Sequence, residues 1–159
     1  MADKKELWIA VDFDGTTRQI RKHIKPLAGR FIAVDFDGTL VLPSFPNITG
    51  ANPYSVEVVK RFRRDGGKII LHTCRQDKPL QDAIDWMCNN GIAPDYINDN
   101  PENRKKYNSA QEDCKKVFAD LYIDDHNVFI KRTKQNAVDF KWINKNYNKI
   151  IQQILNTHC

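Results

Sequence analysis

Closely spaced aspartates follow two apolar stretches of this sequence, and a threonine ends a third. Asp35 and Asp37 come directly after the residues FIAV, Asp124 and Asp125 follow LYI, and Thr73 ends KIILHT. Carboxylates that gather at one place repel one another, so they either take up protons or bind a cation. Mg²⁺ suits such a group because it prefers oxygen ligands and retains several of its waters. The residue types therefore predict a magnesium site formed by these four carboxylates.

The same residues can transfer a phosphoryl group. A bound cation neutralises a phosphate brought against an aspartate, and Asp35 can then attack phosphorus and form an aspartyl phosphate. Asp37 lies two residues further on the same side of an extended chain, where it can protonate the leaving oxygen and later activate water. The Thr73 hydroxyl can donate a hydrogen bond to a phosphoryl oxygen, and a lysine is needed to balance the remaining charge.

The elements expected around these residues alternate between strands and helices. This alternation predicts an α/β protein with a doubly wound, mostly parallel sheet and helices on both faces. Ligands of such sheets bind beyond the carboxyl ends of the strands, which is where the aspartates and Thr73 fall. We expect helices at 55–64, 79–90 and 135–156, a partly helical segment at 101–116, and strands at 31–34, 68–73, 96–97 and 117–124.

The stretch that carries the first aspartates occurs twice. WIAVDFDGTT at 8–17 and FIAVDFDGTL at 31–40 are identical at eight of ten positions, 23 residues apart. Only the second copy is followed by a helix and a strand at the spacing of a βαβ unit. We therefore interpret Asp12 and Asp14 as an inactive duplicate, in an edge strand, an extension or a segment exchanged between chains. The chain divides accordingly into an N-terminal extension, 1–30, and a catalytic domain, 31–159.

Together these motifs resemble those of the haloacid dehalogenase-like (HAD) superfamily of phosphohydrolases. FIAVDFDGTL is similar to its first motif, hhhhDxDGT, IILHTCR to its second, and ADLYIDDHN to its acidic fourth motif. The resemblance covers 31 to about 128 and implies a Rossmann-like sheet, Mg²⁺ and an aspartyl-phosphate intermediate. It implies that Asp35 is the nucleophile, Asp37 the acid and base, and Thr73 a phosphate ligand. Asp124 and Asp125 would complete the metal site.

Two further residues take their expected roles from the resemblance alone. Lys116 is similar to the catalytic lysine of small members without a cap domain, which read K-x-x-A-D-h-Y-I-D-D. Lys115, Lys105 and Lys106 are alternatives for this third motif. Arg75 resembles the arginine that binds the substrate's phosphate in polynucleotide 3′-phosphatases of the superfamily.

The two places where members of this superfamily insert a cap domain are short in this sequence. The stretch 41–53 is a loop of about a dozen residues with several prolines, and 91–114 is also brief. Neither has room for a cap domain. The resemblance therefore implies an active site that is open to water and to large substrates.

The composition is that of a globular protein, and the charge favours binding of anions. The chain has 25 Lys and Arg against 20 Asp and Glu, and 41% of its residues are hydrophobic. Five basic residues and no acid lie in 17–30, which favours binding of a polyanion. Apolar runs of about five residues cannot cross a membrane, and the N-terminus lacks the apolar core of a secretory signal, so we expect a cytoplasmic protein. Four cysteines without a C-x-x-C pair argue against a zinc ribbon.

Two classes of function remain open from the sequence. The first is a Mg²⁺-dependent phosphatase that acts on a phosphomonoester, whether a nucleotide, a polynucleotide end or another compound; a phosphotransferase would use the same nucleophile. The second is a catalytically weak HAD-like binding module, which would hold an anionic partner such as nucleic acid through the basic N-terminal segment and the C-terminal helix. The sequence indicates neither the substrate nor the oligomeric state.

Overall fold

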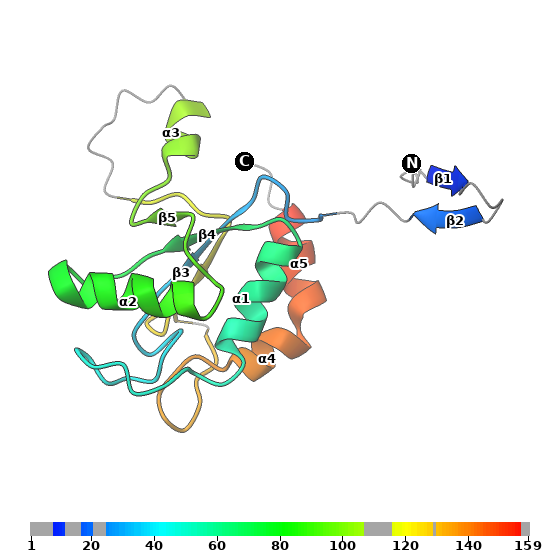
Figure 1. Ribbon diagram of the computed structural model, residues 1–159. Coiled ribbons are helices and arrows are strands. Elements are labelled where there is room, and N and C mark those ends of the chain that lie inside the picture. The colour runs from blue at the N-terminus through cyan, green and yellow to red at the C-terminus, as the bar shows by residue number, and fades with distance from the viewer. Residues whose placement is uncertain (1–7, 12–16, 21–24, 107–115, 129, 157–159) are drawn as a thin grey trace.

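A four-stranded parallel sheet lies at the centre of the molecule (Figure 1). The computed structural model describes residues 8–11, 17–20, 25–106, 116–128 and 130–156, without the side chains of the first two ranges. The strand order is β5-β4-β3-β6, and all neighbouring pairs are parallel. This confirms the predicted α/β class and the parallel sheet. The strands are β3 (Phe31–Val34), β4 (Lys68–Leu71), β5 (Tyr96–Ile97) and β6 (Leu121–Ile123).

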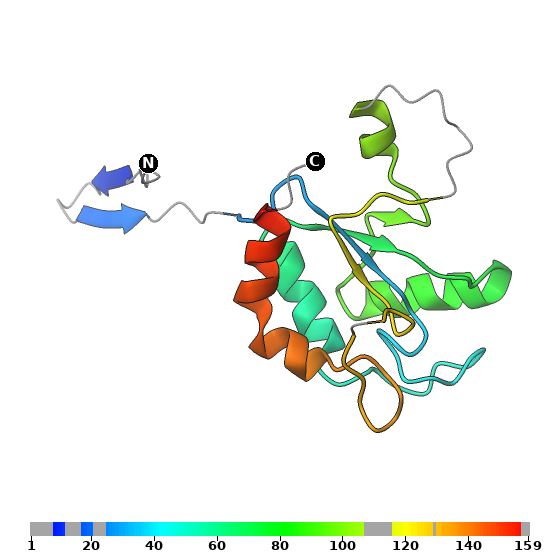
Figure 2. The same cartoon turned by 180° about the vertical axis from the view of Figure 1, so that it is seen from behind.

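In the described part of the chain, five helices connect and cover these strands. They are α1 (Ser55–Arg64), α2 (Asp77–Asn89), α3 (Pro101–Lys106), α4 (Phe140–Lys145) and α5 (Tyr147–Asn156). The helix α1 has the predicted bounds. The prediction of one continuous helix over 135–156 was wrong. The helix α4 begins only at Phe140, where the Asp139 carboxylate caps it by accepting a hydrogen bond from the Trp142 amide. A turn at Asn146 then separates α4 from α5. Views from the front and from behind both show α5 beside α1 (Figures 1 and 2).

The two faces of the sheet are covered unequally. Successive residues of a strand point to opposite faces. Ile32 and Val34 of β3 therefore belong to a large hydrophobic core with residues of α1, α2, α4 and α5, whereas Phe31 and Ala33 belong to a small cluster. The short helix α3 reaches this second face through Glu102, which accepts a hydrogen bond from Lys68. Burial of each large aliphatic side chain contributes about 1.5–3 kcal/mol, so the first face supplies most of the hydrophobic stabilisation.

The two copies of the repeated motif occupy different sheets. The second copy forms β3, which lies between β4 and β6, as predicted. The first copy forms β1 (Trp8–Val11), which pairs antiparallel with β2 (Thr17–Ile20) in a separate two-stranded sheet. Asp12 and Asp14 lie outside the described residues. Leu27, which precedes the predicted boundary at residue 31, is fully buried in the core of the domain.

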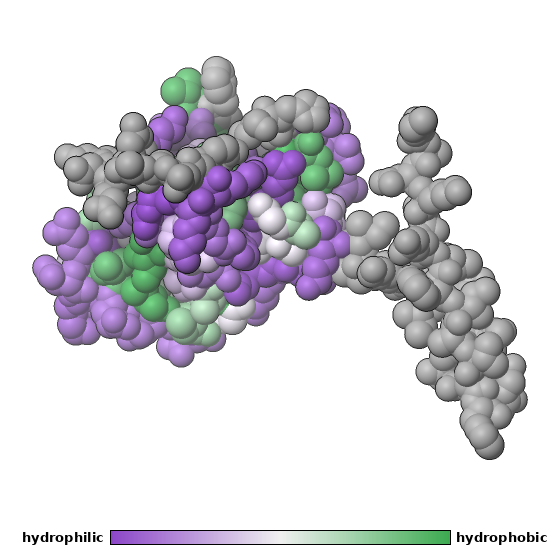
Figure 3. All heavy atoms as spheres, turned by 90° about the horizontal axis from the view of Figure 1, so that it is seen from above, coloured by the Kyte–Doolittle hydropathy of each residue, from purple (hydrophilic) through white to green (hydrophobic). Residues whose placement is uncertain are grey.

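The face of the described residues that is seen from above is mostly polar (Figure 3). Figure 3 shows hydrophilic residues over much of the upper face, with hydrophobic residues in small groups. Five large hydrophobic residues are exposed among those described: Phe45, Tyr54, Ile97, Val128 and Trp142. None of the helices in the described ranges combines the length and the apolar character needed to cross a membrane.

Candidate functional site

The carboxyl ends of β3, β4 and β6 meet at one edge of the sheet. The amide of Asp35 donates to the Ile123 carbonyl at 2.9 Å, which continues the pairing of β3 with β6 one residue beyond β3. On the other side of β3, the amide of His72 donates to the Val34 carbonyl at 2.9 Å. These two bonds place the residues that follow β3, β4 and β6 next to one another, as the sequence predicted.

The Asp35 carboxyl is the most strongly perturbed group at this edge. Its pKa is raised from the ordinary 3.8 to about 7, mainly by burial and also by the nearby Asp124 and Asp125 carboxylates, while hydrogen bonds from the Phe36 backbone and the Thr39 side chain act in the opposite direction. Without a cation, Asp35 is therefore only partly ionised at neutral pH. A positive ion beside it would favour the ionised, nucleophilic form.

We expect Asp35→Asn to stabilise the metal-free protein at pH 8 by about 2 kcal/mol. The native carboxyl, with a pKa of about 7, keeps its proton where the unfolded one, near 3.8, has lost it. Stability therefore falls as the pH rises from about 4 to about 7, and asparagine removes this loss. Each pKa unit corresponds to about 1.4 kcal/mol, and about half of the shift is counted because Asp35 is partly exposed.

Denaturant unfolding of both proteins at pH 4 and pH 8, with chelator present, checks this expectation. The variant should gain stability over the wild type only at the higher pH. Groups that do not interact with residue 35 titrate alike in both proteins and cancel in the difference. An equal difference at the two pH values would contradict the raised pKa of Asp35.

Gly38 and Thr39 hold the turn after β3 against the loop after β6. The Asp125 amide donates to Thr39 Oγ1 at 3.1 Å, and the Thr39 side chain is fully buried. Gly38 has φ +70°, and a Cβ at that position would lie 2.7 Å from Asp125 Oδ2. Thr39 was not among the predicted site residues, although its place after Asp-Gly in the first motif was a visible signal.

Gly38→Ala is expected to lower the free energy of unfolding by about 2 kcal/mol or more. A non-glycine residue in this backbone region costs about 1–3 kcal/mol, and the added methyl group must also displace the Asp125 carboxylate. Urea unfolding measures the loss. Gly29→Ala is the matched control, because Gly29 has φ +77° but nothing within 4 Å of an added Cβ. Equal losses in the two variants would show that contact with Asp125 contributes nothing.

Asp124, Asp125 and His126 form a compact group of possible metal ligands. Each offers one ligand atom, and these atoms lie within 4.8 Å of one another. His126 Nδ1 is 2.8 Å from Asp125 Oδ1, and the His126 amide donates to Asp124 Oδ1 at 2.7 Å. The His126 side chain is 87% exposed, so the two carboxylates are the better-fixed donors of the group.

Asn98 fixes Thr73 at the end of β4. Its side-chain oxygen accepts a hydrogen bond from the Thr73 amide at 2.8 Å, and its amide nitrogen donates to the Thr73 carbonyl at 2.8 Å. Thr73 is 9% exposed, and its hydroxyl oxygen accepts from the Arg75 amide. The hydroxyl hydrogen can therefore be given to a ligand. Asn98 was not among the predicted site residues, although it lies directly after the residues predicted to form β5.

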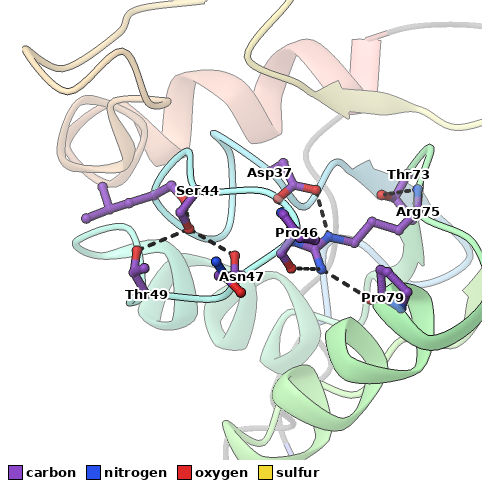
Figure 4. A network of polar contacts seen from close by, with 9 residues as sticks. Asp37, Ser44, Pro46, Asn47, Thr49, Thr73, Arg75 and Pro79 are labelled. Carbon is purple, nitrogen blue, oxygen red and sulfur yellow. Dashed lines mark hydrogen bonds and ion pairs between the residues drawn. The ribbon is translucent and has the colours of Figure 1, made fainter.

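Arg75 and Asp37 form a two-bonded ion pair at the same edge (Figure 4). Arg75 Nε donates to Asp37 Oδ2 and Nη2 donates to Oδ1, each at 2.7 Å. Nη1 donates to the carbonyl oxygens of Pro46 and Pro79. The Arg75 side chain is 1% exposed and that of Asp37 28%. Asp37 and Arg75 were both predicted site residues, and the structure shows that they bind each other.

The lysines offered for the third motif lie in different places. Lys116 is exposed, at the start of the described segment that leads into β6. Lys105 and Lys106 form the last residues of α3, and Lys115 lies outside the described residues. The assignment of Lys116 stays a prediction.

The fold and this edge define a class of protein: an α/β protein whose parallel sheet carries a carboxylate cluster beyond the ends of β3 and β6. Among solved structures, a conserved protein of Bacteroides thetaiotaomicron is similar to this chain, with a TM-score of 0.61 and 30% sequence identity over 76% of this chain and 90% of that one. The chain belongs to the same protein family as that conserved protein, whose name states no activity. No family model and no curated protein matches the chain.

Proposed function

We propose that this protein is a Mg²⁺-dependent phosphohydrolase of the HAD type, which hydrolyses a phosphomonoester through an aspartyl phosphate on Asp35. The observation that carries the proposal is the position of Asp35. It lies beside Asp124 and Asp125, whose charges raise its pKa, and it follows the central strand of the sheet. The resemblance to the HAD motifs implies this same arrangement.

The charges at this edge favour a divalent cation. The ion pairs here are those of Arg75 with Asp37 and of His126 with Asp124 and Asp125. Within the described ranges, no ion pair joins Asp35 to a lysine or arginine. Three carboxylates thus share a site with little positive charge, and oxygen donors suit Mg²⁺.

We assign Asp35, Asp124 and Asp125 to the metal. Asp37 is left out of this set because both of its carboxylate oxygens accept hydrogen bonds from Arg75. Bound there, Mg²⁺ would offset the charge of the phosphate and of the attacking carboxylate.

The side chains then divide the reaction between them. Asp35 forms a bond to phosphorus as the bond from phosphorus to the ester oxygen breaks, and Asp37 gives its proton to that oxygen. Asp37 next takes a proton from water as the water oxygen attacks phosphorus, which releases inorganic phosphate and restores Asp35. The Thr73 hydroxyl donates to a phosphoryl oxygen, and Lys116 supplies positive charge.

The loop after β3 is too short to form a cap domain over the site. Residues 42–50 form a narrow loop whose ends are joined by the Leu42 amide and the Gly50 carbonyl. Ser44 orders it from within, because its hydroxyl donates to the Asn47 carbonyl and accepts from Thr49 Oγ1 (Figure 4). A loop of this kind is too small to enclose a substrate, which favours nucleotides, polynucleotide ends and other bulky phosphomonoesters.

Release of phosphate from para-nitrophenyl phosphate, with Mg²⁺ and with chelator, tests the proposed function. We expect Mg²⁺-dependent release that is lost in Asp35→Asn. A wild-type protein that releases no phosphate but binds an oligonucleotide would instead support the binding module.

A further inference from the structure

The Arg75 guanidinium is buried and almost fully engaged within the protein. Four of its five N–H groups donate to Asp37 Oδ1 and Oδ2 and to the Pro46 and Pro79 carbonyls. Its side chain is 1% exposed. Only one N–H, on Nη2, is left by these bonds, so a two-bonded contact with a phosphate would leave one of these partners without its hydrogen bond, which is costly in a buried site.

These contacts connect three parts of the chain around one carboxylate. Arg75 follows β4, Pro46 lies in the loop after β3, and Pro79 is in the first turn of α2 (Figure 4). The guanidinium carbon also lies 4.8 Å from the centre of the Phe36 ring and 5.2 Å from that of Phe45. The planar guanidinium therefore has a fixed position, and its two parallel hydrogen bonds hold the Asp37 carboxylate in one orientation.

We infer that Arg75 is a positioning residue that holds the Asp37 carboxyl toward the leaving oxygen, and that it is not a ligand of the substrate's phosphate. This inference rests on the proposed function, in which Asp37 is the acid and base. An acid must lie within hydrogen-bond reach of the atom that it protonates, so its orientation matters most where the leaving group cannot depart without a proton. The inference departs from the role that the sequence resemblance suggested for Arg75.

Two substrates with different leaving groups separate these roles. Para-nitrophenolate departs readily without protonation, whereas the alkoxide of glycerol phosphate requires a proton. Arg75→Lys keeps the positive charge but cannot make two parallel bonds to one carboxylate. We expect it to lower kcat/KM for glycerol phosphate by about 100-fold, the low end of the range for general acid catalysis, and for para-nitrophenyl phosphate by less than about fivefold. The inhibition constant of inorganic phosphate should stay at the wild-type value.

Further variants tie the effect to Asp37. Asp37→Asn should show the same dependence on the leaving group. When Asp37→Asn is already present, Arg75→Lys should lower kcat/KM little further, because the effects of substitutions at residues that act as a unit do not add. Lys78→Gln is the matched control, since Lys78 is an exposed cation near the start of α2 that pairs with Asp82. It should match the wild type on both substrates. Arg75→Gln, which retains an N–H donor, replaces Arg75→Lys if that variant does not fold.

The outcomes are distinguishable. Equal losses on the two substrates with weaker inhibition by phosphate would overturn the inference and make Arg75 a phosphate ligand. Equal losses with unchanged inhibition would reduce Arg75 to a purely structural role. A wild-type protein that releases phosphate from neither substrate would overturn the proposed function, and with it this role of Arg75.

Discussion

Asp35→Asn is expected to lower the turnover of a phosphomonoester by roughly 10⁴-fold or more, the scale seen when a nucleophile is removed. Asparagine preserves the size of the side chain but lacks the charged oxygen that forms the bond to phosphorus. The fold should survive the change, because asparagine also avoids the repulsion that Asp35 experiences from Asp124 and Asp125. Initial rates of phosphate release by the two purified proteins, with Mg²⁺ in excess, measure the effect.

The repeated motif supplies a control within the same chain. Asp12→Asn makes the same chemical change in the first copy, which forms a separate sheet with β2 and does not lie between β4 and β6. The turnover of the Asp12→Asn variant should remain at the wild-type level. An equal loss in Asp12→Asn and Asp35→Asn would mean that both copies take part in the reaction.

Removal of Mg²⁺ is expected to abolish activity and to lower the melting temperature. Asp35, Asp124 and Asp125 would then repel one another without a cation. A ligand that binds only the folded state stabilises it by about 2.7 kcal/mol at a concentration 100 times its Kd, so the melting temperature should rise as Mg²⁺ is restored. Calorimetry over a Mg²⁺ titration, together with activity at each concentration, measures both effects.

The rise of activity and melting temperature with Mg²⁺ should be weaker in Asp124→Asn and in Asp125→Asn. Each removes one negative charge from the proposed metal set and keeps the shape of the side chain, so more Mg²⁺ should be needed for the same activity and the same melting temperature. Asp82→Asn, at a half-exposed position of α2 outside the proposed metal set, is the control and should titrate like the wild type. Activity that persists in chelator would contradict the metal-dependent mechanism.

Local patterns predicted the elements that position the site. The helix α1 has the predicted bounds because its apolar residues recur at helical spacing and Gly66 and Gly67 follow its end. The strands β3 and β4 were predicted from short apolar runs, and their polar ends do meet at one edge. The order of elements along the chain also distinguished the two copies of the repeated motif.

The contacts that complete the site could not be predicted from the sequence. Arg75 and Asp37 are 38 positions apart, and the type of each residue suits binding of a ligand as well as it suits an ion pair within the protein. The support of Thr73 by Asn98 crosses 25 positions and depends on the pairing of β4 with β5. The break at Asn146 was hidden because hydrophobic residues keep helical spacing on both sides of it. Each of these features depends on tertiary contacts and not on local propensity.

The covalent intermediate gives the most direct test of the central claim. The wild-type protein is mixed with substrate and Mg²⁺, quenched in acid during turnover, and digested, and mass spectrometry locates any added phosphoryl group. We predict a single phosphoryl group on the peptide that contains Asp35, absent from Asp35→Asn and unchanged in Asp12→Asn. A phosphoryl group on a different residue, or one that persists in Asp35→Asn, would contradict the assignment of Asp35 as the nucleophile.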